Sequence, residues 1–371
     1  MKVLQVLPEL NSGGVERGTL ELAKHLIDQG HQSLVLSNGG RLVPQLESEG
    51  TTHLTLPIHK KSPASLLQIP KIKQLLLQHQ PDILHLRSRV PAWLTYLASK
   101  QLPPAQRPKL VTTVHGLYSV SPYSAIMTKG QTVICVSQSV KDYVLKNYPK
   151  VPPEKLTVIH RGINPEQYHP AYTLPQDWLT NFQAKHPHLT NKRLLLLPGR
   201  LTRWKGQLDF LEILAQLKTT HPDIHGLLAG EAHPRKQNYL AELKTRASQL
   251  HLTDHLTILG NRTDLRELMT HAEITLSLSH EPEAFGRVSL EALSLGKPVA
   301  AYHHGGVAEQ LNTLFPTGKL PVGDTRAAIA LLNQWLTTPP PQPSPNTTFT
   351  LPKLLSSTLQ VYHDLLAKTP S

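Results

Sequence analysis

The sequence lacks the features that mark disulfide-rich secreted proteins and membrane-spanning proteins. Its single cysteine cannot form an internal disulfide, which excludes a disulfide-stapled fold. Purely aliphatic runs such as residues 194–197 are far shorter than the roughly 20 residues that span a bilayer. The chain begins with a strand-like segment, residues 2–7, and not with a signal-peptide pattern. We therefore expect a cytoplasmic protein, and 371 residues leave room for two domains.

Several short chemical motifs are also missing. The chain contains neither G-x-G-x-x-G nor a Walker loop, so dinucleotide oxidoreductases and P-loop ATPases lose support. It has no Asp-x-Asp pair to grip a metal–diphosphate and no Cys/His spacing typical of zinc. We therefore expect no metal site.

The excess of positive charge is unevenly distributed. Residues 1–170 contain 19 Lys/Arg against 10 Asp/Glu, whereas residues 171–371 contain 19 against 16. A basic first half favours an anionic partner such as nucleic acid, a phosphorylated acceptor or an acidic membrane surface. The 19 aromatic residues do not interleave with Lys/Arg runs, so we expect no nucleic acid. A solvated, solubilising surface is the alternative.

Short apolar strands alternate with helical patterns in two series. We predict strands at residues 2–8, 32–37, 53–56, 82–87, 110–115, 132–136 and 156–160, and again at 194–197, 224–229, 256–259, 274–278 and 299–302. The clearest helical patterns cover residues 16–29, 207–219, 239–251, 264–271 and 288–295. Alternating βα units predict an α/β protein with two parallel, Rossmann-like sheets, whose ligands bind beyond the carboxyl ends of the strands.

The domain boundaries follow from the interruptions of this pattern. We expect a first Rossmann-like domain over residues 1–165 and a second over residues 192–338. A proline-rich linker over residues 339–350 should be extended and semi-rigid. The apolar spacing of residues 354–368 predicts a final amphipathic helix.

The loop after the first strand contains Gly13 and Gly14, followed by Glu16 and Arg17. Two glycines let the backbone approach a ligand closely, and the helix start behind them favours anionic oxygens. A plain tight turn is the alternative.

The loop after the first strand of the second half contains Arg200 and Lys205. A guanidinium and an ammonium before a helix form a good clamp for a diphosphate. Two solvated cations are the alternative.

A third loop carries Glu283 and, eight residues later, Glu291. Carboxylates accept hydrogen bonds from vicinal hydroxyls, so a sugar and a ribose are plausible partners, and the amides of Phe285 and Gly286 can bind further oxygens. The pair is also compatible with acid–base glycoside hydrolysis, or with acids that favour a helix start.

Two single residues occupy informative positions. His115 ends a predicted strand before Gly116, which places it at the ligand edge of the sheet. Cys135 lies in an apolar strand, where core packing is its expected role.

Together these segments resemble the retaining glycosyltransferases of family 4, over nearly the whole chain and in the family's order. The residues that carry the resemblance are Gly13, Gly14, Glu16 and Arg17; Gly199, Arg200, Lys205 and Gly206; Glu283 to Glu291; Gly296, Lys297, Pro298 and Val299; and Gly305, Gly306 and Glu309. The resemblance implies a GT-B fold, in which two Rossmann-like domains face each other across a cleft and the C-terminal helix, within residues 351–368, crosses back to the first domain.

The resemblance also implies a division of roles. The second domain would bind a nucleotide-diphosphate sugar of the UDP or GDP type, with Arg200 and Lys205 on the diphosphate, Glu283 on the sugar and Glu291 on the ribose. The other donor-site residues would be Gly13, Gly14, Asn261, Arg262, Phe285 and Gly286, with His115 facing the donor sugar. The nucleotide sugar is a substrate, so no cofactor is expected.

Residues 87–93 resemble a subgroup of bacterial envelope glycosyltransferases associated with lipopolysaccharide. That likeness implies a glycolipid or oligosaccharide acceptor in the first domain, contacted by Arg17, Arg87 and Arg89. A structural salt-bridge role is the alternative for Arg87 and Arg89.

A basic amphipathic segment is compatible with peripheral membrane binding. Lysines 60, 61, 71 and 73 surround the apolar residues Leu66, Leu67, Ile69 and 75–77, and such a surface can rest on anionic lipid. A helix that covers the sheet explains the leucines equally well.

Other activities remain open at this point. A sugar-nucleotide 2-epimerase shares the two-domain architecture and would release a free epimer. A basic nucleic-acid binder would leave Arg200, Lys205 and the two glutamates without a purpose, and a glycosidase would not need the diphosphate clamp.

Overall fold

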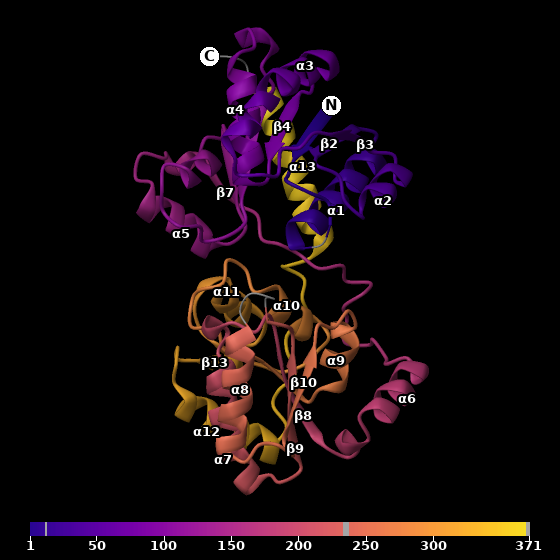
Figure 1. Cartoon of the computed structure of the whole chain (residues 1–371), viewed down its shortest axis with the longest axis vertical. Coiled ribbons are helices and arrows are strands. Elements are labelled where there is room, and N and C mark those ends of the chain that lie inside the picture. The colour runs from indigo at the N-terminus through magenta and orange to yellow at the C-terminus, as the bar shows by residue number, and fades with distance from the viewer. Residues whose placement is uncertain (12, 233–236, 369–371) are drawn as a thin grey trace. The chain divides into compact units, whose positions relative to one another are not determined.

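The computed structural model describes residues 1–11, 13–232 and 237–368, and the chain divides into two compact units (Figure 1). Unit 1 consists of Met1–His160 together with the C-terminal segment from Pro352, and unit 2 is Arg161–Leu351. Residues 161–165, which we expected in the first domain, lie in unit 2. They do so because Ile163 pairs with Thr350 and its amide donates to the carbonyl of Phe349 at 3.2 Å.

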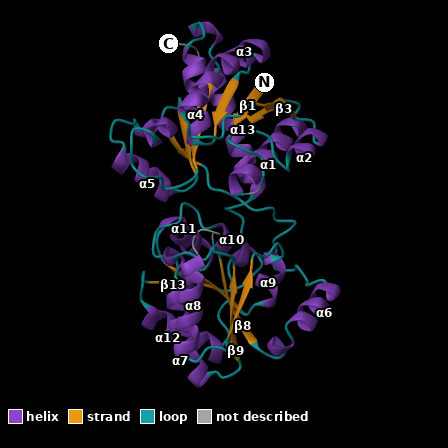
Figure 2. Ribbon diagram, in the orientation of Figure 1, coloured by secondary structure: helices purple, strands orange, loops and turns teal. Residues whose placement is uncertain are grey.

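Unit 1 is built on a seven-stranded parallel sheet of order β3-β2-β1-β4-β5-β6-β7. Its strands are β1 (Lys2–Val6), β2 (Gln32–Ser37), β3 (Thr52–Thr55), β4 (Ile83–Leu86), β5 (Lys109–Val114), β6 (Thr132–Cys135) and β7 (Leu156–Val158). In the register, Val3 of the central strand lies opposite Ser33 on one side and Ile83 on the other. The apolar strands are buried because helices cover both faces of such a sheet, as Figure 2 shows.

The helices of unit 1 follow the strands. Those of six or more residues before the C-terminal helix are α1 (Gly14–Asp28), α2 (Val43–Ser48), the 3₁₀ helix η1 (Pro63–Gln68), α3 (Ile69–His79), α4 (Arg89–Lys100) and α5 (Gln138–Asn147). In α1 the buried residues Leu22, Ala23 and Leu26 recur at helical spacing and face the sheet. Lys24, which lies between them, is exposed to solvent.

The last helix of the chain, α13 (Leu351–Ala367), completes the core of unit 1. Its residues Val361, Tyr362 and Leu365 pack with Val3 and Ile83 of the sheet, and Figure 1 shows α13 in yellow beside the strands of this unit. His85 on β4 is fully buried, with Nδ1 2.6 Å from the Tyr362 hydroxyl.

Unit 2 contains a six-stranded parallel sheet of order β10-β9-β8-β11-β12-β13. Its strands are β8 (Arg193–Pro198), β9 (Ile224–Ala229), β10 (Leu256–Gly260), β11 (Ile274–Ser277), β12 (Val299–Tyr302) and β13 (Lys319–Leu320). Its helices are α6 (Gln176–Lys185), α7 (Gln207–Thr220), α8 (Gln237–Gln249), α9 (Leu265–His271), α10 (Arg287–Ser294), α11 (Gly305–Leu314) and α12 (Thr325–Thr337). The strands β8 and β11 are neighbours at the centre, so the loops that follow them meet.

The proline-rich segment before α13 is tied to unit 2. Asn346 donates to Ser294 Oγ at 2.9 Å, and the amide of Ser344 donates to the carbonyl of Leu314 at 2.8 Å. Phe349 is buried, with its ring centre 6.1 Å from that of Phe285. These contacts hold the segment to the surface of unit 2 up to the start of α13.

Candidate active site

The loop after β8 is pressed against the end of β11. Gly206 has a φ of 73°, and a Cβ at this position would overlap the carbonyl of Leu278. The amide of His280 also donates to the carbonyl of Trp204 at 2.7 Å. Only glycine allows this approach without strain, and it brings Lys205 to the carboxyl end of β11.

Lys205 and Glu283 meet there as an ion pair. Lys205 Nζ lies 2.7 Å from Glu283 Oε1, and the two side chains are 16% and 18% exposed. Ser279 Oγ donates to the same carboxylate oxygen at 2.6 Å. An ammonium beside a carboxylate offers one group for phosphate oxygens and another for sugar hydroxyls. The structure therefore brings together two residues from separate predicted motifs.

Ser279 and His304 support this pair and were missed in the sequence. Ser279 is buried, and its carbonyl oxygen lies 2.6 Å from His304 Nε2. No local motif distinguishes either residue, because their positions depend on how the ends of β11 and β12 lie against each other.

The Gly305–Gly306 pair places the start of α11 on the Glu283 loop. A Cβ at Gly305 would lie 2.9 Å from the amide nitrogen of Glu283, and the amide of Gly306 donates to the carbonyl of Glu283 at 2.8 Å. A side chain at either glycine would separate the two segments. The glycines therefore position the carboxylate through backbone packing.

The loop from Glu283 leads directly into α10. Phe285 is buried, and Gln310 Nε2 donates to the carbonyls of Phe285 and Gly286 at 2.5 and 3.1 Å. Gly286 has a φ of 82° and precedes the first residue of the helix. The N-terminal amides of α10 supply donors and a positive dipole end next to Glu283.

Glu291 lies in the second turn of α10 and is buried, with Oε1 2.7 Å from Arg287 Nε. The remaining predicted donor residues follow other strands of this sheet. Arg200 is exposed after β8, and its carbonyl accepts from Gln207 Nε2 at 3.0 Å. Asn261 is exposed after β10.

Arg262 forms a bidentate ion pair with Asp264, at 2.9 and 2.6 Å. Burial opposes ionisation of Asp264, but hydrogen bonds from Arg262 and from Trp178 Nε1 outweigh it and hold the pKa of the Asp264 carboxyl below its usual value. This pair fixes the turn that follows β10.

The residues predicted in the first half follow three strands of unit 1, β1, β4 and β5. Gly13 precedes α1 with a φ of 145°, Gly14 is the first residue of that helix, and Arg17 is exposed on it. His115 follows β5, and its amide donates to the Tyr118 hydroxyl at 3.2 Å.

The two arginines after β4 have different surroundings. Arg87 is buried, with Nη1 donating to Gln5 Oε1 at 2.8 Å, while Gln5 Nε2 donates to the carbonyl of Thr19 at 3.1 Å. Arg89 lies over the ring of Tyr118, 4.6 Å from its centre, and donates to Ser124 Oγ at 3.1 Å. Arg87 therefore links β4, β1 and α1 inside unit 1.

Two family models match the chain. The model for Glycosyltransferase Family 4 covers residues 12–167, and the model for Glycosyl transferases group 1 covers residues 180–345. The chain belongs to the family 4 glycosyltransferases. The predicted family, the GT-B type of α/β fold and the enzymatic nature of the protein are thereby confirmed.

Several known proteins are similar to this glycosyltransferase over most of its length. A crystal structure of a glycosyltransferase from Rickettsia africae is 33% identical, covers 99% of both chains and superposes with a TM-score of 0.85. The N-acetyl-alpha-D-glucosaminyl L-malate synthase of Bacillus anthracis is 27% identical over 86% of this chain and 82% of its own length. The Anabaena protein HepE, solved in complex with UDP-glucose, is 23% identical, covers 99% of this chain and 95% of its own, and has a TM-score of 0.72.

Every helix among the described residues is too short or too polar to span a bilayer. Within the same residues, no cluster of three or more His, Cys, Asp or Glu side chains is arranged to hold a metal ion.

Proposed function

We propose that this glycosyltransferase moves a hexose, with retention of anomeric configuration, from a UDP- or GDP-sugar to a hydroxyl of an envelope glycan or glycolipid, in lipopolysaccharide core synthesis. The observation that supports a nucleotide-sugar donor is the Lys205–Glu283 pair, held by Ser279 at the ends of β8 and β11. Parallel α/β sheets bind ligands at this edge.

The chemistry of the proposed donor site follows from its charges. As the nucleoside diphosphate departs, Lys205, Arg200 and the N-terminal amides of α10 stabilise its negative charge. Glu283 and Ser279 hold hydroxyls of the sugar, and Glu291 holds the ribose. These preorganised groups stabilise the negative charge that a metal ion stabilises in other transferases, so we propose a metal-independent reaction.

Retention requires no enzyme nucleophile in this scheme. The acceptor hydroxyl attacks the anomeric carbon on the face that the diphosphate leaves, and a phosphate oxygen takes the hydroxyl proton. The Asn261–Arg262 turn is proposed to border the base, and the roles of Gly13, Gly14 and His115 stay predictions. HepE, a protein of the same fold, binds UDP-glucose, which makes UDP the first nucleotide to test.

Calorimetric titration with UDP, GDP and ADP tests the donor site. We expect one nucleotide to bind and Lys205→Ala to weaken its binding about 10- to 100-fold, because a charge-assisted contact to phosphate is lost. Lys244→Ala removes an exposed lysine from α8 and is the matched control. Equal affinity and turnover in both variants would rule out the proposed clamp, and product analysis separates transfer from release of a free epimer.

We propose further that unit 1 binds the acceptor at an anionic membrane surface. Its basic composition supports this, and Lys71, Leu67 and Leu77 are exposed on η1 and α3. In flotation assays, the protein should rise with vesicles that contain phosphatidylglycerol and remain behind with neutral vesicles. Absence of binding to both kinds of vesicle would contradict the proposal.

A further inference from the structure

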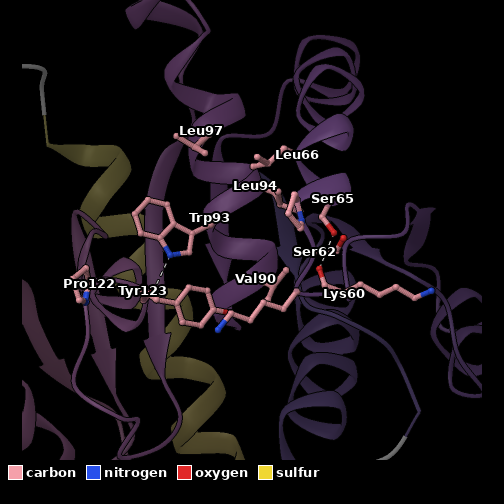
Figure 3. A pocket seen from close by; sticks show the side chains of 12 residues that line it. Lys60, Ser62, Ser65, Leu66, Val90, Trp93, Leu94, Leu97, Pro122 and Tyr123 are labelled. Atoms are coloured by element: carbon pink, nitrogen blue, oxygen red, sulfur yellow. Dashed lines mark hydrogen bonds between the residues drawn. The ribbon is translucent and has the colours of Figure 1, made fainter.

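An apolar pocket lies in unit 1 against one face of α4 (Figure 3). Its volume is about 540 Å³, within the usual range for small-molecule sites. Three segments form its walls: residues 60–66 before and within η1, residues 90–97 of α4, and Pro122 with Tyr123 after β5.

The floor of the pocket is an apolar helix face. Val90, Trp93, Leu94 and Leu97 recur at the spacing of one side of a helix, and all four line the pocket. From Val90 to Leu97 the face extends roughly 10 Å along the helix axis. Leu66 completes the apolar wall from η1, although 53% of its surface is exposed. An apolar chain laid along α4 would cover these side chains.

The rim of the pocket is positively charged. Lys60 and Lys61 are exposed at the pocket, and Lys61 Nζ lies 4.5 Å from the ring centre of Tyr123. Among the lining residues that the structure describes, none is acidic. An anionic group is therefore favoured at this basic rim.

Hydrogen bonds hold the walls in place. Trp93 Nε1 donates to the carbonyl of Tyr123 at 2.9 Å, which joins α4 to the loop after β5. Ser65 Oγ donates to the carbonyl of Lys60 at 2.7 Å, which fixes the turn that carries the lysines. The pocket is thus preformed, which lowers the ordering cost of binding.

We propose that this pocket holds the hydrocarbon chain of an anionic amphiphile, with its phosphate headgroup at Lys60 and Lys61. This inference rests on the proposed function, in which the acceptor is a glycolipid. It extends that proposal by assigning a site to the hydrocarbon chain of a phosphorylated lipid. The pocket binds one chain between its walls and is distinct from adsorption of the outer leucines onto a membrane.

Dodecyl phosphate below its micelle concentration is the probe, with inorganic phosphate as the headgroup alone. In calorimetry we expect dodecyl phosphate to bind at least about 100-fold more tightly than phosphate, because burial of each methylene contributes. Leu66→Glu should weaken binding of dodecyl phosphate at least about tenfold, because it places a carboxylate in the apolar wall.

Leu67→Glu is the matched control. Leu67 is the neighbouring residue, is 73% exposed and is not among the residues that line the pocket. The Leu67→Glu variant should bind dodecyl phosphate with an affinity within about twofold of that of the unchanged protein, because the exposed side chain of Leu67 is not part of the pocket wall. Equal weakening by both substitutions would indicate adsorption to a surface and overturn the proposal, as would failure of the unchanged protein to bind.

A spectroscopic measurement locates the chain. Trp93 is the only tryptophan of residues 1–160, so a bromine-labelled dodecyl phosphate should quench its fluorescence, and Trp93→Phe should abolish that part of the quenching. Unchanged quenching in Trp93→Phe would place the chain elsewhere.

UDP titration separates this inference from the proposed donor site. Leu66→Glu should bind UDP as the unchanged protein does, because Leu66 belongs to unit 1 and the Lys205–Glu283 pair to unit 2. If the protein binds UDP but not dodecyl phosphate, only the pocket proposal is contradicted. If it binds dodecyl phosphate but none of the nucleotides, only the proposed donor site is contradicted.

Discussion

At the scale of single residues, the Glu283 carboxylate is held on two sides. The Lys205 ammonium neutralises its charge, and the buried Ser279 hydroxyl donates to the same oxygen. A side chain with two such partners keeps one orientation, which is what a group that must recognise sugar hydroxyls requires.

Ser279→Ala tests the contribution of that hydroxyl. Loss of one hydrogen bond to a carboxylate should weaken binding of the nucleotide sugar about tenfold and have less effect on the nucleotide alone, because Glu283 is proposed to contact the sugar. The measurement is the pair of dissociation constants for UDP-sugar and UDP. Ser248→Ala, at an exposed position on α8, is the control. Equal losses for both ligands would assign Ser279 to general packing.

His225 makes the stability of unit 2 sensitive to acid. Burial, with a smaller contribution from the neighbouring His188, lowers the pKa of His225 to about 4, while its Nε2 lies 2.9 Å from Thr257 Oγ1. The imidazole of His225 binds a proton more tightly in the unfolded state than in the folded state, so acid favours unfolding. Its contribution to the free energy of unfolding is therefore fully present above pH 6.5 and is lost as the pH falls from there toward 4.

His225→Gln should reduce this sensitivity, because glutamine can bond Thr257 but does not titrate. We expect the loss of unfolding free energy between pH 7.5 and pH 5 to shrink by about 2 kcal/mol. Urea denaturation at the two pH values measures it. An unchanged loss in the variant would show that other groups control the acid response.

At the scale of elements, α13 is joined to the first sheet by a buried polar contact as well as by apolar packing. His85 is bonded on both ring nitrogens, by Tyr362 and by Thr113 Oγ1, each at 2.6 Å. Burial, aided by the nearby Arg87, holds the pKa of His85 well below its usual value, so the ring is neutral, with one donor and one acceptor.

Tyr362→Phe should cost about 1 to 3 kcal/mol of unfolding free energy, because a buried ring nitrogen of His85 loses its partner. Tyr96→Phe, at a half-buried position on α4, should change stability by less than about 0.5 kcal/mol. Urea denaturation of both variants makes the comparison. Equal effects would mean that the His85–Tyr362 bond adds nothing to the attachment of α13.

The strands could be located from the sequence because buried parallel strands are short apolar runs bounded by turns. The predicted segment 224–229 coincides with β9, whereas β13, with two residues, carries too little pattern to be recognised. The helix α6 lies between the two predicted domains, in a stretch whose periodicity is too weak to predict a helix. On this helix the rings of Trp178 and Phe182 stack with centres 4.9 Å apart.

The site was predictable where a motif carries it and not where distant segments create it. Lys205 and Glu283 follow from their loops, but Ser279 acquires its role only through the close approach at Gly206. Arg87 falls at the end of a predicted strand, but its burial and its hydrogen bond to Gln5, 82 residues earlier in the chain, could not be predicted. Contacts between residues that are far apart in the chain cannot be recognised from the local spacing of residue types.

At the scale of the whole molecule, the two units carry different chemistry. Unit 2 presents the ion pair and helix start proposed for the donor, whereas unit 1 has most of the excess positive charge and the apolar pocket beside Lys60 and Lys61. Because the two proposals depend on different units, their experiments can succeed or fail separately. Both the charge and the pocket of unit 1 suit the anionic acceptor that we propose for it.

The membership of α13 in unit 1 has a consequence for biosynthesis. The first sheet emerges from the ribosome well before Val361, Tyr362 and Leu365, which belong to its core. At ordinary elongation rates, translation of the intervening segment takes roughly 10 to 40 seconds, during which part of an apolar surface has no cover. We therefore expect ribosome-associated chaperones to bind the nascent chain. A premature stop codon late in the coding sequence would remove α13 and so destabilise unit 1, most of which is translated first.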